Sequence, residues 1–144
     1  MIDDDVRRVV YEMAVRSGSI PLATDVARVL SVDASEIAQA FRRLAEAHIL
    51  VLQRDRDEIL MAMPFSAVPT PFVVESGGIR AYANCMWDAL GIPAMMHAGA
   101  SITTSCPDCG TAATLTVANE QIRDDGFVHF ALPVKKWWND VVFT

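Results

Sequence analysis

The sequence predicts an α+β protein. A winged-helix-like part of three helices, residues 1–62, is expected to pack on a mixed, mostly antiparallel sheet with flanking helices, residues 63–144. Apolar residues recur at helical spacing as far as residue 44, whereas later apolar runs are short and separated by turn residues. With 52% hydrophobic residues, the 144-residue chain can bury the core of one ordinary domain or of two very small subdomains.

Three helices are predicted in the first half of the chain. Apolar side chains fall on one helix face within residues 3–17, and Gly18 closes that helix. A short second helix runs as far as Leu30. Asp33 or Ser35 then caps a third helix, because short polar side chains accept hydrogen bonds from the free N–H groups of a first turn.

A β-hairpin is predicted directly after these helices. Residues 49–52 and 59–61 are apolar and flank a charged stretch, so helices plus hairpin have the order of a winged helix. Residues 1–62 nevertheless hold eight Arg against eleven Asp and Glu, a net charge of −3. DNA binding needs a positive surface, which favours a docking or dimerisation role for this part instead.

The second half supplies the predicted sheet and one further helix, which begins near Cys85. A Gly77-Gly78 turn follows the first of its strands and makes a hairpin. Further strands are expected on both sides of a turn at residues 106–109 and near the C-terminus. The expected strands cover residues 73–75, 99–105, 113–118 and 127–132, with a last one starting at residues 141–143.

Composition excludes several classes of protein. A net charge of −6 argues against a nonspecific nucleic-acid binder. The chain has no apolar run of 18 residues, and its acidic start lacks the features of a secretory signal, so no membrane role and a cytoplasmic location are expected. Three cysteines without a secretory context are interpreted as free thiols or metal ligands rather than as a disulfide framework.

Cys85 and Asp88 are the first candidates for chemistry. Residues three apart share a helix face, which puts a thiol beside a carboxylate. In a first helical turn the free N–H groups lower the pKa of a cysteine, whereas a nearby carboxylate raises it, so we expect a pair that shares a proton. Without further evidence, a small buried structural residue is the more common interpretation of such a cysteine, and a solvated helix residue or a capping partner is the alternative for Asp88.

The segments around this pair resemble the alkylmercury lyase family. The resemblance is carried by residues 61–72, 82–96, 105–110 and 115–117. It implies that Cys85 attacks the mercury of an organomercurial and that Asp88 takes the thiol proton and returns it to the carbon leaving group. The products would be a hydrocarbon and Hg(II) held by Cys85 and Asp88, with a small organometallic substrate and no required cofactor; another soft metal is an alternative ligand.

Cys106 and Cys109 form a second candidate metal site. A CxxC pair supplies two ligands, whereas structural zinc requires four, and His97 and His129 are poorly placed to complete the set. Redox chemistry, metal binding and a tight turn with buried thiols remain open for this pair. The resemblance implies a mainly structural role for Cys106.

The resemblance also implies a second mercury-binding cysteine well after the first. Residues 137–144 look like the segment that leads up to it, so we expect a truncated or divergent member that lacks the last strands. Two alternatives stay open: the same fold serving another small-molecule lyase or a soft-metal binding protein, and a winged-helix regulator that senses metal through Cys106 and Cys109. A homodimer is compatible with each.

The sequence also offers candidates for the residues that surround Cys85 and Asp88. Tyr82, Met95 and Met96 are candidates to line an apolar pocket for an organic group, although core packing is their more common role. Trp87 is expected to point away from the face shared by Cys85 and Asp88.

Overall fold

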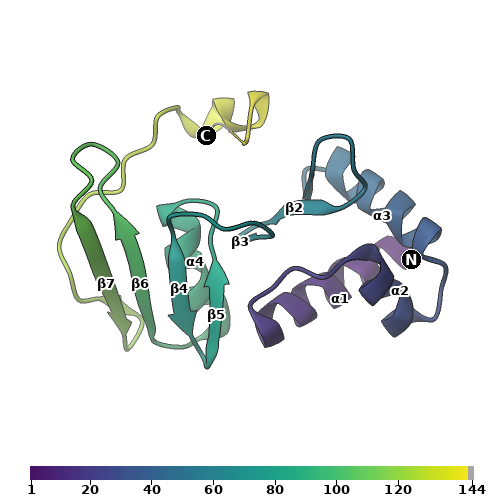
Figure 1. Cartoon of the computed structure of the whole chain (residues 1–144), viewed down its shortest axis with the longest axis horizontal. Coiled ribbons are helices and arrows are strands. Elements are labelled where there is room, and N and C mark those ends of the chain that lie inside the picture. Colours follow the sequence, from purple (N-terminus) through teal and green to yellow (C-terminus); the bar gives the residue numbers. More distant parts are fainter. Residues whose placement is uncertain (143–144) are drawn as a thin grey trace.

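The computed structural model describes residues 1–142 and has an α+β architecture, as the sequence predicts (Figure 1). Three helices come first: α1 (Ile2–Ser17), α2 (Ala23–Leu30) and α3 (Ala34–Glu46). A three-stranded sheet follows, made of β1 (Val51–Leu52), β2 (Ile59–Ala62) and β3 (Phe65–Ser66). The order of three helices and a hairpin is as expected, while a winged-helix role for this part stays a prediction.

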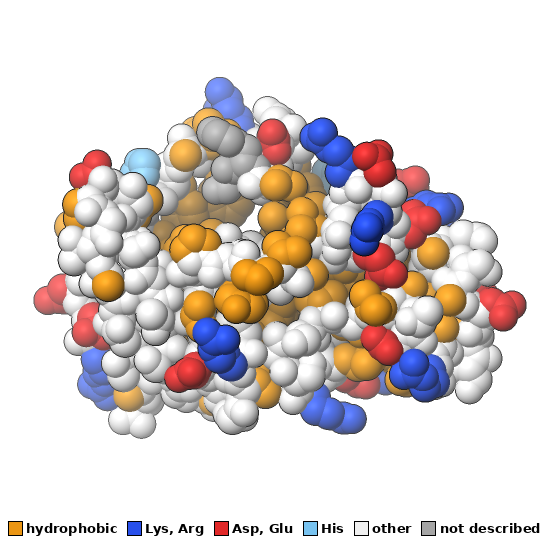
Figure 2. Space-filling model, in the orientation of Figure 1, with side chains coloured by type: hydrophobic (Ala, Val, Ile, Leu, Met, Phe, Trp, Pro, Cys, Tyr) orange, Lys and Arg blue, Asp and Glu red, His pale blue; other side chains and the backbone are white. Residues whose placement is uncertain are grey.

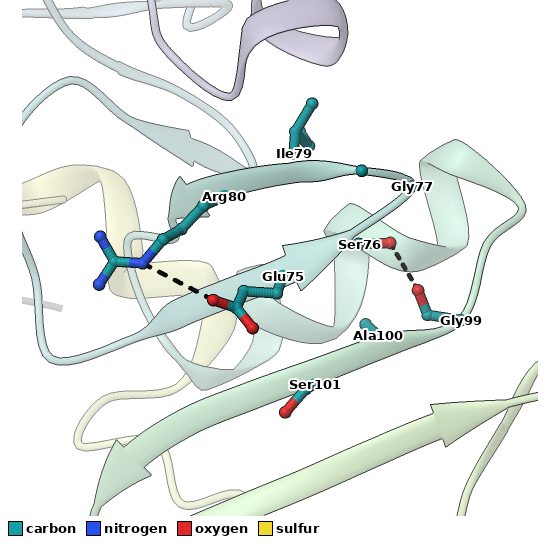
Figure 3. Close-up of a pocket in the computed structure, with 9 residues that line it drawn as sticks. Glu75, Ser76, Gly77, Ile79, Arg80, Gly99, Ala100 and Ser101 are labelled. Atoms are coloured by element: carbon teal, nitrogen blue, oxygen red, sulfur yellow. Dashed lines mark hydrogen bonds and ion pairs between the residues drawn. The ribbon is translucent and has the colours of Figure 1, made fainter.

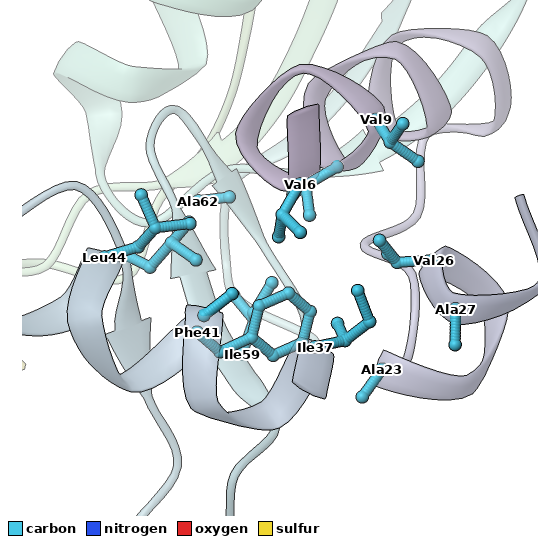
Figure 4. Close-up of a cluster of buried hydrophobic side chains, with 13 residues drawn as sticks. Val6, Val9, Ala23, Val26, Ala27, Ile37, Phe41, Leu44, Ile59 and Ala62 are labelled. Carbon is cyan, nitrogen blue, oxygen red and sulfur yellow. The ribbon is translucent and has the colours of Figure 1, made fainter. Parts of the chain in front are cut away.

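Helical periodicity buries the inner faces of these helices in a first core. Val6, Val9 and Val10 of α1 meet Ile37 and Phe41 of α3, and all five are at most 2% exposed. Figure 4 shows Phe41 among side chains from the helices and from β2. Burial of such side chains contributes about 1.5–3 kcal/mol each before the loss of conformational entropy, and it holds the hairpin against α3.

The two arginines on α3 are both paired. Arg42 binds the carboxylate of Asp57 with two guanidinium nitrogens, and Arg43 binds Asp3 in the same manner. Each pair is partly exposed, so it orders the local side chains but adds little to the free energy of unfolding. The helix that a DNA-binding winged helix would use therefore has its cationic side chains neutralised, in agreement with the acidic composition.

A five-stranded antiparallel sheet forms the second half, in the order β5-β4-β6-β7-β8. Its long strands β6 and β7 pair from Ala100↔Val117 to Ser105↔Ala112. Helix α4 (Met86–Met96) packs on β4 and β6, and a second core lies between them. The strands are β4 (Val73–Ser76), β5 (Ile79–Tyr82), β6 (Ala100–Ser105), β7 (Ala112–Ala118) and β8 (Gln121–Ile122).

The two halves are joined through the end of α1 and through β3. Ala14 of α1 and Phe65 of β3 belong to the second core, and Phe65 forms an isolated antiparallel bridge with Ala83. Gly18 ends α1 in the left-handed conformation and abuts β5, where a Cβ would overlap the carbonyl oxygen of Arg80. Close packing at this glycine thus sets the position of the helix against the sheet.

The C-terminal segment differs from expectation. Residues 127–132 form no strand, and Phe127 is fully exposed, because no neighbouring strand offers hydrogen bonds to this stretch within residues 1–142. The segment instead crosses from the sheet toward the first half and forms a 3₁₀ helix, η1 (Val134–Asn139) (Figure 1). There Trp138 stacks on His48, with ring centroids 4.2 Å apart.

The strand expected to start at residues 141–143 does not form in the part of that stretch that the structure describes. Val141 and Val142 lie in a turn, and Phe143 lies outside the described residues. None of the helices within residues 1–142 has the length and apolar character needed to cross a bilayer.

Two glycine variants test the junction between α1 and β5. Gly18 and Gly78 both have positive φ, but only at Gly18 would a Cβ meet other atoms. Gly78→Ala should therefore cost about 1 kcal/mol of unfolding free energy, from the left-handed backbone alone. Gly18→Ala should cost at least about 1 kcal/mol more, because the overlap with Arg80 forces the helix away. Chemical denaturation measures both, and equal losses would contradict close packing at Gly18.

Candidate functional site

Cys85 stands at the start of α4, directly after β5. It is the N-cap residue, with extended backbone angles, rather than a member of the first helical turn as the sequence suggested. Its sulfur accepts a hydrogen bond from the backbone N–H of Asp88 at 3.5 Å. The thiol therefore occupies the place that serine or aspartate takes in most helices, where the side chain binds a free N–H of the first turn.

Asp88 is held by its neighbour Asn84. The Asn84 Nδ2 amide donates to Asp88 Oδ2 at 3.0 Å and to the carbonyl of Phe65 at 3.2 Å. The amide thus links the carboxylate to β3 and limits its rotation. The Oδ1 atom of Asn84 is buried and accepts no hydrogen bond from the residues that the structure describes. An unpaired buried acceptor is costly, which marks this amide as a polar group still available to a ligand or water.

Burial raises the pKa of Asp88 above the ordinary value of a carboxyl, and the hydrogen bond from Asn84 opposes this rise only in part. The pKa of the Cys85 thiol is also raised, first by burial and then by the negative charge of Asp88. The N–H groups at the helix start lower the pKa of Cys85, as the sequence predicts. This effect is smaller than the rise in pKa that burial causes. Both groups are thus biased toward holding a proton.

Cys85, Asp88 and Asn84 line an apolar pocket of about 80 Å³. Two methionines from β2 and the turn after it, three aromatic rings and two valines form the rest of its wall. Figure 2 shows hydrophobic side chains gathered around a hollow in the middle of this face. The other lining residues are Met61, Met63, Trp87, Phe130, Trp137, Val141 and Val142.

Sequence reasoning missed most of this wall. Trp87 lines the pocket and is 58% exposed, so the expectation that it points away is wrong. Met61 and Met63 take the role for which Met95 and Met96 were candidates, and neither of the latter nor Tyr82 contacts the pocket. Only a signal for long-range contacts would have found these residues, because they come from β2, its following turn and the C-terminal segment.

Tyr11 of α1 lies close to Asp88. Its hydroxyl donates to the carbonyl of Met63 at 3.1 Å. Burial raises the pKa of Tyr11, and the negative charge of Asp88 raises it further. The tyrosine therefore stays protonated and supports the backbone of Met63 at the pocket wall.

Cys106 and Cys109 are not part of this pocket. They lie in the turn between β6 and β7, where Cys109 is exposed and Cys106 half-buried. Hydrogen bonds from Thr111 and an interaction with the Cys106 thiol lower the pKa of Cys109 to about 7. Within residues 1–142 no group of three or more His, Cys, Asp or Glu side chains is arranged to hold a metal ion, so His97 and His129 do not join the pair.

A second hollow lies at the β4–β5 hairpin and the start of β6 (Figure 3). It is larger, about 580 Å³, but it is a shallow surface feature, and no cysteine, histidine or lysine is among the described residues that line it. Its charged side chains, Glu75 and Arg80, are exposed and only 4.0 Å apart, so they neutralise each other. The Cys85 pocket is therefore the better candidate for chemistry.

The site thus consists of a thiol and a carboxyl of raised pKa on one wall of an apolar pocket. The family model for alkylmercury lyase matches residues 65–144, more than half of the chain, and the protein belongs to this family. The matched range contains Cys85, Asp88 and Asn84.

Solved structures agree with the fold. The chain is similar to the crystal structure of the mercury-bound form of MerB2, with a TM-score of 0.64 at 19% sequence identity. The alignment covers 83% of this chain and 59% of that one, so this protein spans about three fifths of the length of its structural neighbour. No curated protein matches the sequence.

The raised pKa of Asp88 has a consequence for stability. Between the ordinary value of 3.8 and the raised value, the folded state binds more protons than the unfolded state, so the free energy of unfolding falls as pH rises through this window. Asp88→Asn removes the buried charge and should make the protein more stable above that window, with little change below it. Denaturation from pH 3 to pH 8 measures this difference.

The exposed Asp4 of α1 provides the control. Asp4→Asn removes the same charge but loses a favourable interaction with the helix N-terminus, so it should bring no gain. An Asp88→Asn protein that is less stable than wild type at pH 8 would contradict the burial of this carboxylate.

Proposed function

We propose that the protein is an organomercurial lyase-like enzyme that cleaves carbon–mercury bonds by protonolysis, with Cys85 as nucleophile and Asp88 as proton relay. The observation that carries this proposal is the pair itself: one sulfur and one carboxyl joined through a helix N-terminus on the wall of an apolar pocket. Membership of the alkylmercury lyase family supports the reaction class.

The steps follow from the two side chains. The Asp88 carboxylate takes the proton of the Cys85 thiol, and the thiolate forms a bond with the mercury of R–Hg–X while X leaves. The carbon–mercury bond then breaks with its electron pair on carbon, and that carbon takes the proton from Asp88. The products are R–H and Hg(II), which stays on the sulfur of Cys85 with the regenerated carboxylate beside it.

The pocket wall suits such a substrate. Met61 and Met63 offer polarisable thioethers, and Trp87, Phe130 and Trp137 offer ring surfaces to the organic group. The raised pKa of Asp88 serves the mechanism because it makes the carboxylate a better acceptor for the thiol proton, which Asp88 then delivers to carbon. Cys85 is the single thiol among the lining residues that the structure describes, so only one thiolate stabilises the Hg(II) left after cleavage and turnover should be weak.

We also propose that the two parts of the chain, residues 1–62 and 63–144, are separate domains with different roles. Ala62 is buried in the first core and Phe65 in the second, which supports a boundary between them. The first part would then act as a packing partner that supplies Met61 and backs the pocket with Tyr11.

Benzene release from phenylmercury tests the reaction. The reduced wild-type protein should release benzene, and Cys85→Ser should lower the rate to that of buffer, because an alcohol is a hard and weakly acidic ligand. Asp88→Asn should lower it about 10²–10⁴-fold. Gas chromatography of the headspace gives the product. Cys106→Ser serves as the matched control and should keep the wild-type rate. Benzene release by a folded Cys85→Ser protein would overturn the assignment.

The same experiment distinguishes the lyase from the alternative, in which the same fold binds a soft metal or cleaves another small molecule. Such a protein would bind phenylmercury at Cys85 without producing benzene. Intact-protein mass spectrometry distinguishes a retained phenylmercury adduct from bound Hg(II).

Asn84 gives a second test through the pH profile. Its amide lowers the pKa of Asp88, so Asn84→Ala should raise that pKa further. Because Asp88 must be ionised to accept the thiol proton, the acidic limb of kcat/KM should move to higher pH. Exposed Asn139→Ala is the control and should leave the limb in place. An unchanged limb in Asn84→Ala would show that Asp88 is not the titrating group.

A further inference from the structure

The turn that connects β6 and β7 carries the two cysteines that the pocket does not use. Figure 1 shows this turn at one end of the sheet, on the far side of the molecule from α1, α2 and α3. The last residue pair of the hairpin is Ser105↔Ala112, and Cys106 and Cys109 follow within the turn itself. They are therefore presented by a structure that is separate from the Cys85 pocket.

Backbone hydrogen bonds hold the turn in one conformation. The N–H of Cys106 donates to the carbonyl of Thr111, and the N–H of Gly110 donates to the carbonyl of Cys106, both at 2.8 Å. Gly110 has a φ of +72°, and open space surrounds the position of a Cβ there. Its role is thus conformational: it lets the chain turn back so that both cysteines project from one short loop.

The closed turn keeps the two cysteines close together in space. The Cys109 sulfur is 3.2 Å from the hydroxyl oxygen of Thr111, and interaction with the Cys106 thiol contributes to the lowered pKa of Cys109. Both thiols are free, and Cys109 is exposed. A buried structural pair would be closed to solvent, whereas this pair is accessible to an ion in solution.

We propose that Cys106 and Cys109 form a second soft-metal site, which binds one Hg(II) ion as a bis-thiolate. Tetrahedral zinc requires four ligands, and no third His, Cys, Asp or Glu joins the pair within residues 1–142. An ion that is strongly attracted to sulfur and satisfied by few ligands fits such a pair. On binding, both thiols lose their protons, two S–Hg bonds form, and Hg(II) sheds two of its former ligands, such as chloride.

This site stands apart from the proposed lyase reaction, so it is tested without an organomercurial. Reduced Cys85→Ser protein, which keeps only the turn cysteines, is titrated with mercuric chloride in the presence of excess glutathione. Thiolate-to-mercury charge-transfer absorbance and native mass spectrometry should report one Hg(II) per chain. Removing either turn cysteine as well, in C85S/C106S or C85S/C109S, should weaken binding at least about tenfold, because the second thiolate acts at a high effective concentration.

The triple variant C85S/C106S/C109S is the baseline and should bind no Hg(II) against glutathione. Circular dichroism checks that each variant is folded. Equal affinity of the Cys85→Ser protein and the two double variants would overturn the proposal, as would one Hg(II) shared between two chains of Cys85→Ser. The C106S/C109S variant with Cys85 intact should still release benzene from phenylmercury, so a failure of the lyase proposal and a failure of this site give different results.

Discussion

The hydrogen bond from the Asp88 N–H to the Cys85 sulfur is the contact on which the candidate site depends. It starts α4 with a thiol as the capping group and so fixes the sulfur one helical turn from the carboxyl. Helix α4 itself is held by the core beneath it, where Ala89 and Ile92 pack against β4 and β6. The pair is thereby placed by a helix that is packed on the sheet, and its geometry does not rest on a surface loop.

Burial sets the chemical character of this pair. A helix N-terminus alone would favour thiolate, but desolvation and the adjacent carboxyl favour the protonated thiol. Asn84 moderates the same effect on Asp88 by donating a hydrogen bond to the ionised form. The protein thus gives up stability at neutral pH to keep an acid in an apolar wall, as is common where function requires an unfavourable group. In the proposed reaction, this carboxyl is the group that delivers a proton to the departing carbon.

The pocket exists because three distant segments meet. Met61 and Met63 come from β2 and the turn that follows it, Trp87 from α4, and Trp137 from the C-terminal segment. The stacking of Trp138 on His48 fastens that last segment to the first half, and the edge-to-face contact of Phe130 with Trp87 fastens it to α4. The small first part of the chain therefore contributes to the site directly, whereas Arg42 and Arg43, paired with acids, contribute nothing to a cationic surface.

Local sequence determined the helices, the hairpins and the shared face of Cys85 and Asp88, since periodicity and turn chemistry act over a few residues. It also determined the CxxC turn, in which glycine and proline constrain the backbone. It failed for residues 127–132, whose apolar run is typical of a strand but finds no partner. The tertiary structure alone decided which way the pKa values of Cys85 and Asp88 move and which side chains wall the pocket. Desolvation and packing depend on residues far apart in the chain, and no local pattern encodes them.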